Sequence, residues 1–368
     1  MEFKRMPIEI ESPEEVGYGN ININLAESSA YELDLLELDL DLNRIKPEYT
    51  DHRGHPTLRK LISEEGEGLV ASDVLLTGGA AMAMYFVYSS ILNAGDKIGI
   101  VFPNYSSNLQ SPRTLGYQII QINLTFEENW ELPLAQVEKA ALEGARMISL
   151  TTPHNPTGNG ITKNQINDLL LLTSKYKLIL LFDETYRDAC FESTYPLLAS
   201  FHTNWISIIS FSKGYGLPGI RIGAIITKNK SWYESCLAAK ETIQICNPPL
   251  EEAIAYAFYT RRLEFVSKMN AKAQANLAVL KAWLDHENRV EAVLPQGGLV
   301  CFVRIKKVAS NLDHFYKNLF EQHGLIVGPG HWFDMDDQYM RIGFGYPDEL
   351  KLKAGLRIIS NALDEYGK

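Results

Sequence analysis

Lys213 is the residue with the clearest potential for covalent chemistry, because it directly follows an apolar run over residues 205–211. Such a run is typical of a buried strand, and the glycines and proline that come after Lys213 end it abruptly. An amine that loses water at the exit of a buried strand has a lowered pKa and becomes a nucleophile toward carbonyl groups. A loop-edge lysine with its ammonium in water is the ordinary alternative. The rest of the chain has to decide between the two.

Other chemically useful groups follow other predicted strands. Apolar runs at 74–77, 97–102, 147–151 and 178–182 alternate with helical patterns, which predicts a mostly parallel sheet. Ligands bind outside the carboxyl ends of such strands. The groups expected at that edge are the backbone of Gly79, Ala80 and Ala81, then Tyr105, Asn155, Asp183 with Tyr186, and finally Lys213.

This set of groups matches what pyridoxal phosphate needs. Lys213 would form a Schiff base with its aldehyde, and Asp183 would keep its pyridine nitrogen protonated. Tyr186 and Asn155 would hydrogen-bond its phenolate oxygen, and Tyr105 would stack on the ring. The sequence therefore predicts a pyridoxal phosphate enzyme.

The phosphate of that cofactor would lie at the start of the helix that follows residues 74–77. Free backbone N–H groups at Gly79–Ala81 favour an anion there. Ser210 and Ser212 alternate with Phe211 and so would share one strand face, and Arg221, expected inside a second strand, would add its guanidinium. Because no Gly-x-Gly-x-x-Gly opens a helix after a strand, a dinucleotide site is not expected.

The fold class expected is α/β, with helices on both faces of the sheet. From about residue 232 the pattern changes to long helices, and the last third mixes strands at 299–305 and 339–344 with helices at 311–323 and 349–366. This indicates a second, smaller α+β domain.

Composition narrows the class of protein. The chain has 368 residues, 46% hydrophobic and 22% charged, which is ordinary globular composition. A net charge of −10 argues against a nucleic-acid partner. Four scattered cysteines predict neither disulfides nor a metal site. We expect a soluble cytoplasmic protein, because neither a secretory signal nor a run long enough to cross a membrane is visible.

Taken together, these motifs resemble the class I/II aminotransferases, which are fold type I pyridoxal phosphate enzymes. The resemblance rests on Ser-x-Ser-Lys-x7-Arg-x-Gly at 210–223, on Asn-Pro-Thr-Gly at 155–158, and on Asp183-x-x-Tyr186. It implies a three-layer large domain over residues 31–279, and a small domain made of residues 1–30 and 280–368. It also implies that Arg341 binds the substrate α-carboxylate, with Asn155 as a further substrate-binding residue. Tyr49 would reach the phosphate of a neighbouring subunit, which implies a homodimer with shared active sites.

The sequence departs from the family pattern near its N-terminus. Where the family has a glycine followed by a proline, residues 25–30 read Leu-Ala-Glu-Ser-Ser-Ala, with Ser28 in place of the glycine. This segment resembles a branch that includes capreomycidine synthase, which processes an arginine derivative. Glu27 and Ser28 are therefore candidate substrate-binding residues, and Glu27 would favour a cationic side chain. A solvated loop carboxylate is the ordinary interpretation of Glu27.

The function expected is transfer of an amino group from an amino acid to a 2-oxo acid. Cyclisation, elimination or oxidation of an amino acid, possibly a basic one such as arginine or a derivative, is the alternative, because the same cofactor serves all of these reactions. A pyridoxal phosphate-dependent transcription regulator is not expected, because it would need a DNA-binding segment and the chain is acidic.

Overall fold

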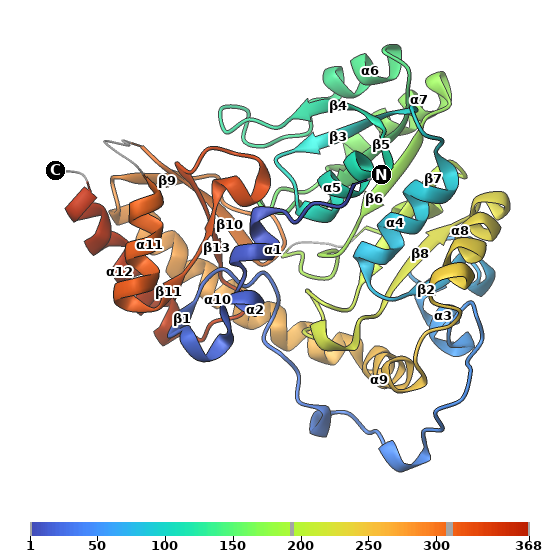
Figure 1. The fold of residues 1–368 in the computed structure, drawn as a ribbon, viewed down its shortest axis with the longest axis horizontal. Coiled ribbons are helices and arrows are strands. Elements are labelled where there is room, and N and C mark those ends of the chain that lie inside the picture. The colour runs from blue at the N-terminus through green and yellow to red at the C-terminus, as the bar shows by residue number, and fades with distance from the viewer. Residues whose placement is uncertain (1, 192–194, 307–311, 367–368) are drawn as a thin grey trace.

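The computed structural model describes residues 2–191, 195–306 and 312–366. Figure 1 shows two regions, each built around its own sheet, with the long helix α10 (Arg262–His286) running between them. The region on the right in the view holds the larger sheet, and the region on the left holds the C-terminal part of the chain.

The larger sheet has seven strands and is mostly parallel, as the sequence predicts. Along the sheet the order is β2 (Val74–Thr77), β8 (Gly223–Thr227), β7 (Trp205–Ser210), β6 (Ile179–Asp183), β5 (Ala145–Thr151), β3 (Lys97–Phe102) and β4 (Gln118–Asn123). Only β8 is antiparallel to its neighbours β2 and β7. The carboxyl ends of six strands therefore lie along one edge, and β8 begins at that same edge.

Both faces of this sheet are covered by helices. Strand β8 shows why, since Ile225 packs in one apolar cluster while Ala224 and Ile226 pack in another. Successive side chains of a strand point to opposite faces, so an uninterrupted apolar strand must be buried on both sides. The first cluster contains residues of α4 (Ala80–Ile91), α5 (Ser106–Leu115), α6 (Leu134–Leu142), α7 (Lys163–Tyr176) and α8 (Lys230–Ile243), and the second contains residues of α3 (Pro56–Ser63), α9 (Pro249–Thr260) and α10.

The smaller region has an antiparallel sheet and two helices. The sheet order is β12 (Gly328–Pro329), β13 (Tyr339–Gly343), β10 (Val300–Ile305) and β9 (Val290–Ala292), and the helices are α11 (Leu312–His323) and α12 (Glu349–Tyr366). The predicted helix at 311–323 begins one residue outside the described part of the chain. These elements match the expected α+β pattern.

The N-terminal arm joins this smaller region. Strand β1 (Ile23–Asn24) pairs in parallel with β11 (Leu325–Ile326), and the short helices α1 (Pro7–Glu11) and α2 (Pro13–Val16) precede it. The N-terminal arm and the C-terminal part of the chain are therefore hydrogen-bonded to each other through these strands. The boundaries near residues 30 and 280 stay a prediction, because α10 continues without a break across residue 280.

None of the helices in the described part of the chain is long and apolar enough to cross a membrane.

Candidate active site

The sequence-predicted groups meet at the carboxyl edge of the larger sheet. A cavity of about 700 Å³ opens there, and ten of the predicted residues line it, namely Ala80, Ala81, Tyr105, Asn155, Asp183, Tyr186, Ser210, Ser212, Lys213 and Arg221. Strands β3, β5, β6 and β7 are neighbours in the sheet and parallel, so the residues that follow them are brought to one place.

A second cavity of about 290 Å³ adjoins the first. Lys213 and Tyr105 line both cavities, while Glu27, Ser28 and Arg341 line the second. Residues from the N-terminal arm and from β13 of the smaller region therefore close over the edge of the larger sheet. The site lies between the two regions of the chain.

Asp183 ends strand β6 at the floor of the larger cavity. Its Oδ1 accepts hydrogen bonds from the Thr185 backbone N at 3.1 Å and the Thr185 hydroxyl at 2.6 Å. Its Oδ2 accepts one from the Asn108 amide at 3.1 Å. Burial raises the pKa of Asp183, and the donors on Thr185 and Asn108 oppose that rise. The carboxylate is thus positioned by neutral donors and has no basic partner among its hydrogen bonds within the described residues.

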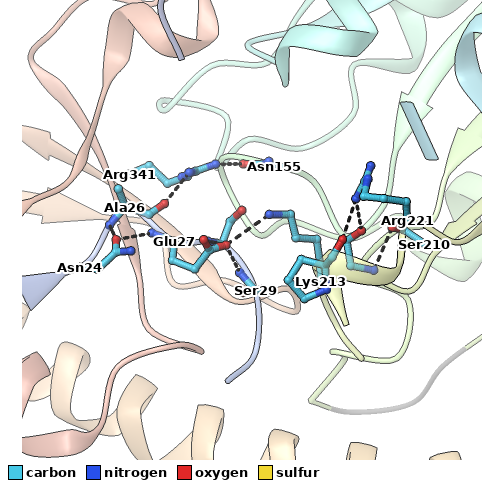
Figure 2. A network of polar contacts seen from close by, with 12 residues as sticks. Asn24, Ala26, Glu27, Ser29, Asn155, Ser210, Lys213, Arg221 and Arg341 are labelled. Carbon is cyan, nitrogen blue, oxygen red and sulfur yellow. Dashed lines mark hydrogen bonds and ion pairs between the residues drawn. The ribbon is translucent and has the colours of Figure 1, made fainter. Parts of the chain in front are cut away.

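Lys213 points toward the N-terminal arm. Its Nζ lies 3.3 Å from Oε1 of Glu27, and its side chain is 25% exposed (Figure 2). The interpretation of Lys213 as a lysine in open solvent is therefore wrong. The interpretation of Glu27 as a solvated loop carboxylate is wrong as well, because Glu27 is only 9% exposed and faces the lysine. The tertiary fold buries this loop under β13, which its polar composition did not indicate.

The two charges alter each other's titration. Burial opposes ionisation of Glu27, but the Lys213 ammonium and the N–H of Ser28 lower the pKa of Glu27 to about 2. Burial also opposes the charge on Lys213, yet the Glu27 carboxylate raises the pKa of Lys213 above its ordinary value. The sequence-based expectation of a lowered lysine pKa therefore does not hold for the free amine.

Arg341 lies on β13 between β12 and β10, and it is 2% exposed. Its Nη1 donates to Oδ1 of Asn155 at 3.0 Å, and its Nη2 donates to the Ala26 carbonyl at 2.6 Å (Figure 2). Within the described residues its Nε has no partner. Burial lowers the pKa of Arg341. A surface arginine at a strand edge is excluded, and the Nε–H of Arg341 is available to an acceptor in the cavity.

The serines and Arg221 form a group beside the first turn of α4. Arg221 Nη1 donates to the Ser212 hydroxyl at 3.1 Å, and the Ser212 N donates to the Ser210 hydroxyl at 3.1 Å. The expectation that Arg221 lies inside a strand is wrong. It precedes β8 with a left-handed φ of 51°, because a turn at residues 218–220 delays the strand. Since β8 begins at the carboxyl edge, Arg221 still reaches the site.

Gly79 leaves space for an anion beside the first turn of α4. A Cβ at Gly79 would lie 2.7 Å from Nη2 of Arg221, and its φ of 91° is one that other residues rarely adopt. The guanidinium can therefore approach the backbone at the start of α4. The N–H groups at Ala80 and Ala81 are in the first turn of that helix, where they have no partner in the helix itself.

Of the predicted site residues, Gly79 and Tyr49 line neither cavity, and Gly79 directly precedes Ala80, which lines the larger one. Tyr49 is 81% exposed and precedes α3 in the chain. Figure 1 shows that the segment before α3 loops away from the body of the chain. The predicted role of Tyr49 belongs to a neighbouring subunit, so its position here leaves that role a prediction.

Sequence reasoning missed two residues that hold Asp183. Asn108 is fully buried in the first turn of α5, and Thr185 lies between Asp183 and Tyr186. Asn108 lies three residues after Tyr105, close to the predicted edge, and that proximity was the available signal. Its distance of 75 residues from Asp183 in the chain hid the contact.

The described residues fit pyridoxal phosphate chemically. The Tyr186 hydroxyl is buried, and within the described chain it has no hydrogen-bond partner, so it is free for a group in the cavity. A Cβ at Gly79 would fill the space beside the first turn of α4, so glycine keeps that space open for a phosphate. Asp183 offers a carboxylate for the ring nitrogen. Amine, carboxylate, phenol and anion site thus surround one cavity.

Comparison with known proteins identifies the family. The model for aminotransferase class I and II matches residues 34–357. Capreomycidine synthase from Streptomyces vinaceus is 25% identical over 90% of this chain and 84% of its own. An aspartate aminotransferase from Sulfolobus acidocaldarius is 24% identical over 86% of this chain and 82% of its own.

A solved structure shows the same fold over the full length. The crystal structure of a PLP-dependent aminotransferase from Streptococcus suis superposes with a TM-score of 0.92 at 26% identity, covering 100% of both chains. The family match and this fold confirm the sequence-based expectation. The protein therefore belongs to the class I and II aminotransferases, whose cofactor is pyridoxal phosphate.

Proposed function

We propose that the protein transfers the amino group of an amino acid to a 2-oxo acid, with Lys213 as the covalent anchor of the cofactor. The observation that carries the proposal is that Lys213 and the buried Arg341 line the same cavity of about 290 Å³. A base and a carboxylate-binding guanidinium are what an amino acid substrate requires around its Cα.

Each residue of the site has a proposed role toward the cofactor. Asp183 would accept a hydrogen bond from the ring nitrogen, Tyr186 and Asn155 would hydrogen-bond the phenolic oxygen, and Tyr105 would stack on the ring. The residues around the start of α4 would hold the phosphate, namely Gly79, Ala80, Ala81, Ser210, Ser212 and Arg221, with Tyr49 of a second copy of the chain.

When bound, pyridoxal phosphate supplies the electron sink that makes the Cα–H bond of an amino acid acidic. Arg341 orients the substrate carboxylate through two parallel N–H groups. Asn155 holds Nη1 of Arg341 and so fixes the plane of the fork. Lys213 Nζ accepts the Cα proton and carries it across the site. Ser28 and Glu27 form the wall beside the substrate.

A half-reaction screen tests this proposal. Each amino acid is added to the holoenzyme without an acceptor, and pyridoxamine phosphate is measured by absorbance and chromatography. Stoichiometric formation is expected with the true donor, and Lys213→Ala should abolish it. Lys60→Ala, on the exposed side of α3, is the matched control and should keep it. Full turnover by Lys213→Ala would overturn the proposal.

A second candidate is a different reaction on an amino acid, such as cyclisation, elimination or oxidation. Two observations favour it, namely the match to capreomycidine synthase and the carboxylate of Glu27 at 3.3 Å from Lys213 Nζ. In the same screen, release of ammonia or consumption of oxygen without pyridoxamine phosphate would select this candidate. The cytoplasmic location and the homodimer stay predictions.

A further inference from the structure

The backbone around Glu27 is hydrogen-bonded to Asn24 and to strand β13. The N–H groups of Ala26 and Glu27 donate to Oδ1 of Asn24 at 3.1 and 3.0 Å, and Gly343 N donates to the Leu25 carbonyl at 2.7 Å. A Cβ at Gly343 would lie 1.8 Å from the Glu27 carbonyl oxygen, so only glycine permits this close approach. These contacts therefore set the position of the Glu27 Cα, from which the side chain extends.

The carboxylate of Glu27 is directed at Lys213. Its Oε1 accepts hydrogen bonds from the N–H groups of Ser28 at 2.8 Å and Ser29 at 3.1 Å, and it lies 3.3 Å from Lys213 Nζ (Figure 2). The Ala30 N–H also donates to the Lys213 carbonyl at 2.9 Å, which ties the two segments together. Chain segments 186 residues apart thus meet at one ion pair.

Four titratable or charged groups act on the Lys213 amine. Tyr186, Tyr105 and Glu27 favour its charge, while Arg341 on β13 repels it. Glu27 is the carboxylate within hydrogen-bond distance of Nζ in the described part of the chain. A lysine held as an ammonium cannot accept the Cα proton, so this pair works against the base that the proposed function requires.

We propose that Glu27 holds Lys213 as an ammonium, and that a positively charged side chain of the substrate frees the amine by taking its place at the carboxylate. This inference rests on the proposed function. The Glu27 carboxylate already accepts hydrogen bonds from two backbone N–H groups. When the cation of the substrate pairs with this carboxylate, it partly neutralises the charge that stabilises the Lys213 ammonium. The pKa of Lys213 therefore falls, and the amine loses its proton more readily. Glu27 thereby couples the charge of the substrate to the protonation of the base.

The surroundings of Glu27 suit such a substrate. Lys213 lines both cavities, and Glu14 of α2 lines both as well, so a second carboxylate flanks the path of a substrate side chain. Glu32 lines the larger cavity, on the side of the arm. A cationic side chain would therefore meet negative charge beyond the Cα, while its carboxylate meets Arg341.

The first test compares arginine with citrulline, which have nearly the same shape and differ in side-chain charge. Single-turnover rate constants with the holoenzyme are measured by stopped-flow absorbance between pH 6 and 10. We expect arginine to react at least about tenfold faster near pH 7, the size of effect that 1.4 kcal/mol produces. The rate with citrulline should rise with pH, as Lys213 loses its proton. The arginine advantage should vanish in Glu27→Gln and persist in Glu131→Gln, an exposed matched control.

The second test does not depend on turnover. Pyridoxamine phosphate is bound to the cofactor-free chain, so that Lys213 is free, and 5-guanidinopentanoate or 5-ureidopentanoate is added in a calorimeter. In buffers of different ionisation enthalpy, the guanidino compound should bind at least about tenfold tighter and release a proton. Glu27→Gln should remove both effects. Glu27→Asp, which keeps the charge, should retain part of the preference.

The outcomes separate the two proposals. Equal binding of the two compounds to the wild-type protein, which requires no substitution, would overturn the role of Glu27. So would a preference that survives in Glu27→Gln. If the binding preference holds but no amino acid forms pyridoxamine phosphate, the role of Glu27 stands and the proposed transfer reaction is wrong.

Discussion

The side-chain amide of Asn108 donates a hydrogen bond to Oδ2 of Asp183 over 3.1 Å, and both residues are buried. The same amide also contacts Oγ1 of Thr151 at 3.2 Å, on the neighbouring strand β5. Burial raises the pKa of Asp183, and the hydrogen bond from Asn108 opposes that rise by stabilising the charged carboxylate.

Asn108→Ala should weaken cofactor binding by about tenfold or more, because a hydrogen bond to a buried charged group contributes about 1.5–3 kcal/mol. Without this donor the pKa of Asp183 should rise further, so the loss should be greatest at low pH. Equilibrium dialysis of pyridoxal phosphate against pH measures both effects. Asn164→Ala, on the exposed side of α7, is the control. An unchanged affinity and pH profile would show that Asn108 does not act through Asp183.

Gly79→Ala should disrupt the phosphate site specifically. Gly95→Ala is a matched control, since Gly95 has φ 87° against 91° for Gly79, but a Cβ added at Gly95 would meet no atom within 4 Å. Both substitutions place a side chain on a residue with positive φ, while at Gly79 the added Cβ also collides with Arg221. We expect Gly79→Ala to bind pyridoxal phosphate at least about tenfold more weakly than Gly95→Ala, the loss of about one charge-assisted hydrogen bond. Equal affinities of Gly79→Ala and Gly95→Ala for pyridoxal phosphate would show that Arg221 does not contribute to the phosphate site.

His331 should make the stability of the chain depend on pH. Its Nδ1 lies 2.7 Å from Oδ1 of Asp337, and its Nε2 lies 2.8 Å from Oε2 of Glu11 on α1. Burial opposes protonation, but the two carboxylates raise the pKa of His331 from 6.5 to about 9. Because the folded pKa is the higher one, the stabilisation is complete below pH 6.5 and is lost as pH rises through about 9.

Thermal denaturation of the wild type and of His331→Asn between pH 6 and 10 measures this effect. The half-exposed ring limits the difference to about 1 kcal/mol, which should shrink as pH rises. His323→Asn, at the exposed end of α11, should show no such trend. A constant difference between His331→Asn and the wild type across this range would contradict the prediction.

Tyr49→Phe should weaken cofactor binding although Tyr49 lies outside the cavities of its own chain. Thr50 is fixed by a hydrogen bond from its hydroxyl to the Asn247 carbonyl at 2.9 Å, so the exposed Tyr49 ring is presented outward. We expect a homodimer in sedimentation velocity and about tenfold weaker binding of pyridoxal phosphate, from one lost hydrogen bond to a charged group. Tyr195→Phe, outside both cavities, is the control. A monomeric protein with full activity would contradict both expectations.

The sequence predicted much of this fold because its signals are local. Strand β2 and helix α12 begin and end at the expected residues, since apolar patterns and breakers define them within a few positions. Parallel strands share their carboxyl edge, so Asp183 and Lys213 could be placed at one site without coordinates. The prediction placed Arg221 inside a strand, because apolar periodicity does not reveal the turn that precedes β8. Arg221 still reaches the site because β8 runs antiparallel and begins at the carboxyl edge.

By itself, then, the amino-acid sequence determined the order of the elements and the residues that leave the sheet at its carboxyl edge, including Lys213. Only the tertiary structure decided what faces those residues. Glu27 meets Lys213, Asn155 meets Arg341, and each pair is 186 residues apart in the chain. Such contacts arise when the N-terminal arm and β13 pack against the edge of the larger sheet. This packing depends on the whole fold, because the segments that meet are far apart in the chain. Glu27 is buried beside Lys213, and so becomes its counter-charge, only once the chain has folded.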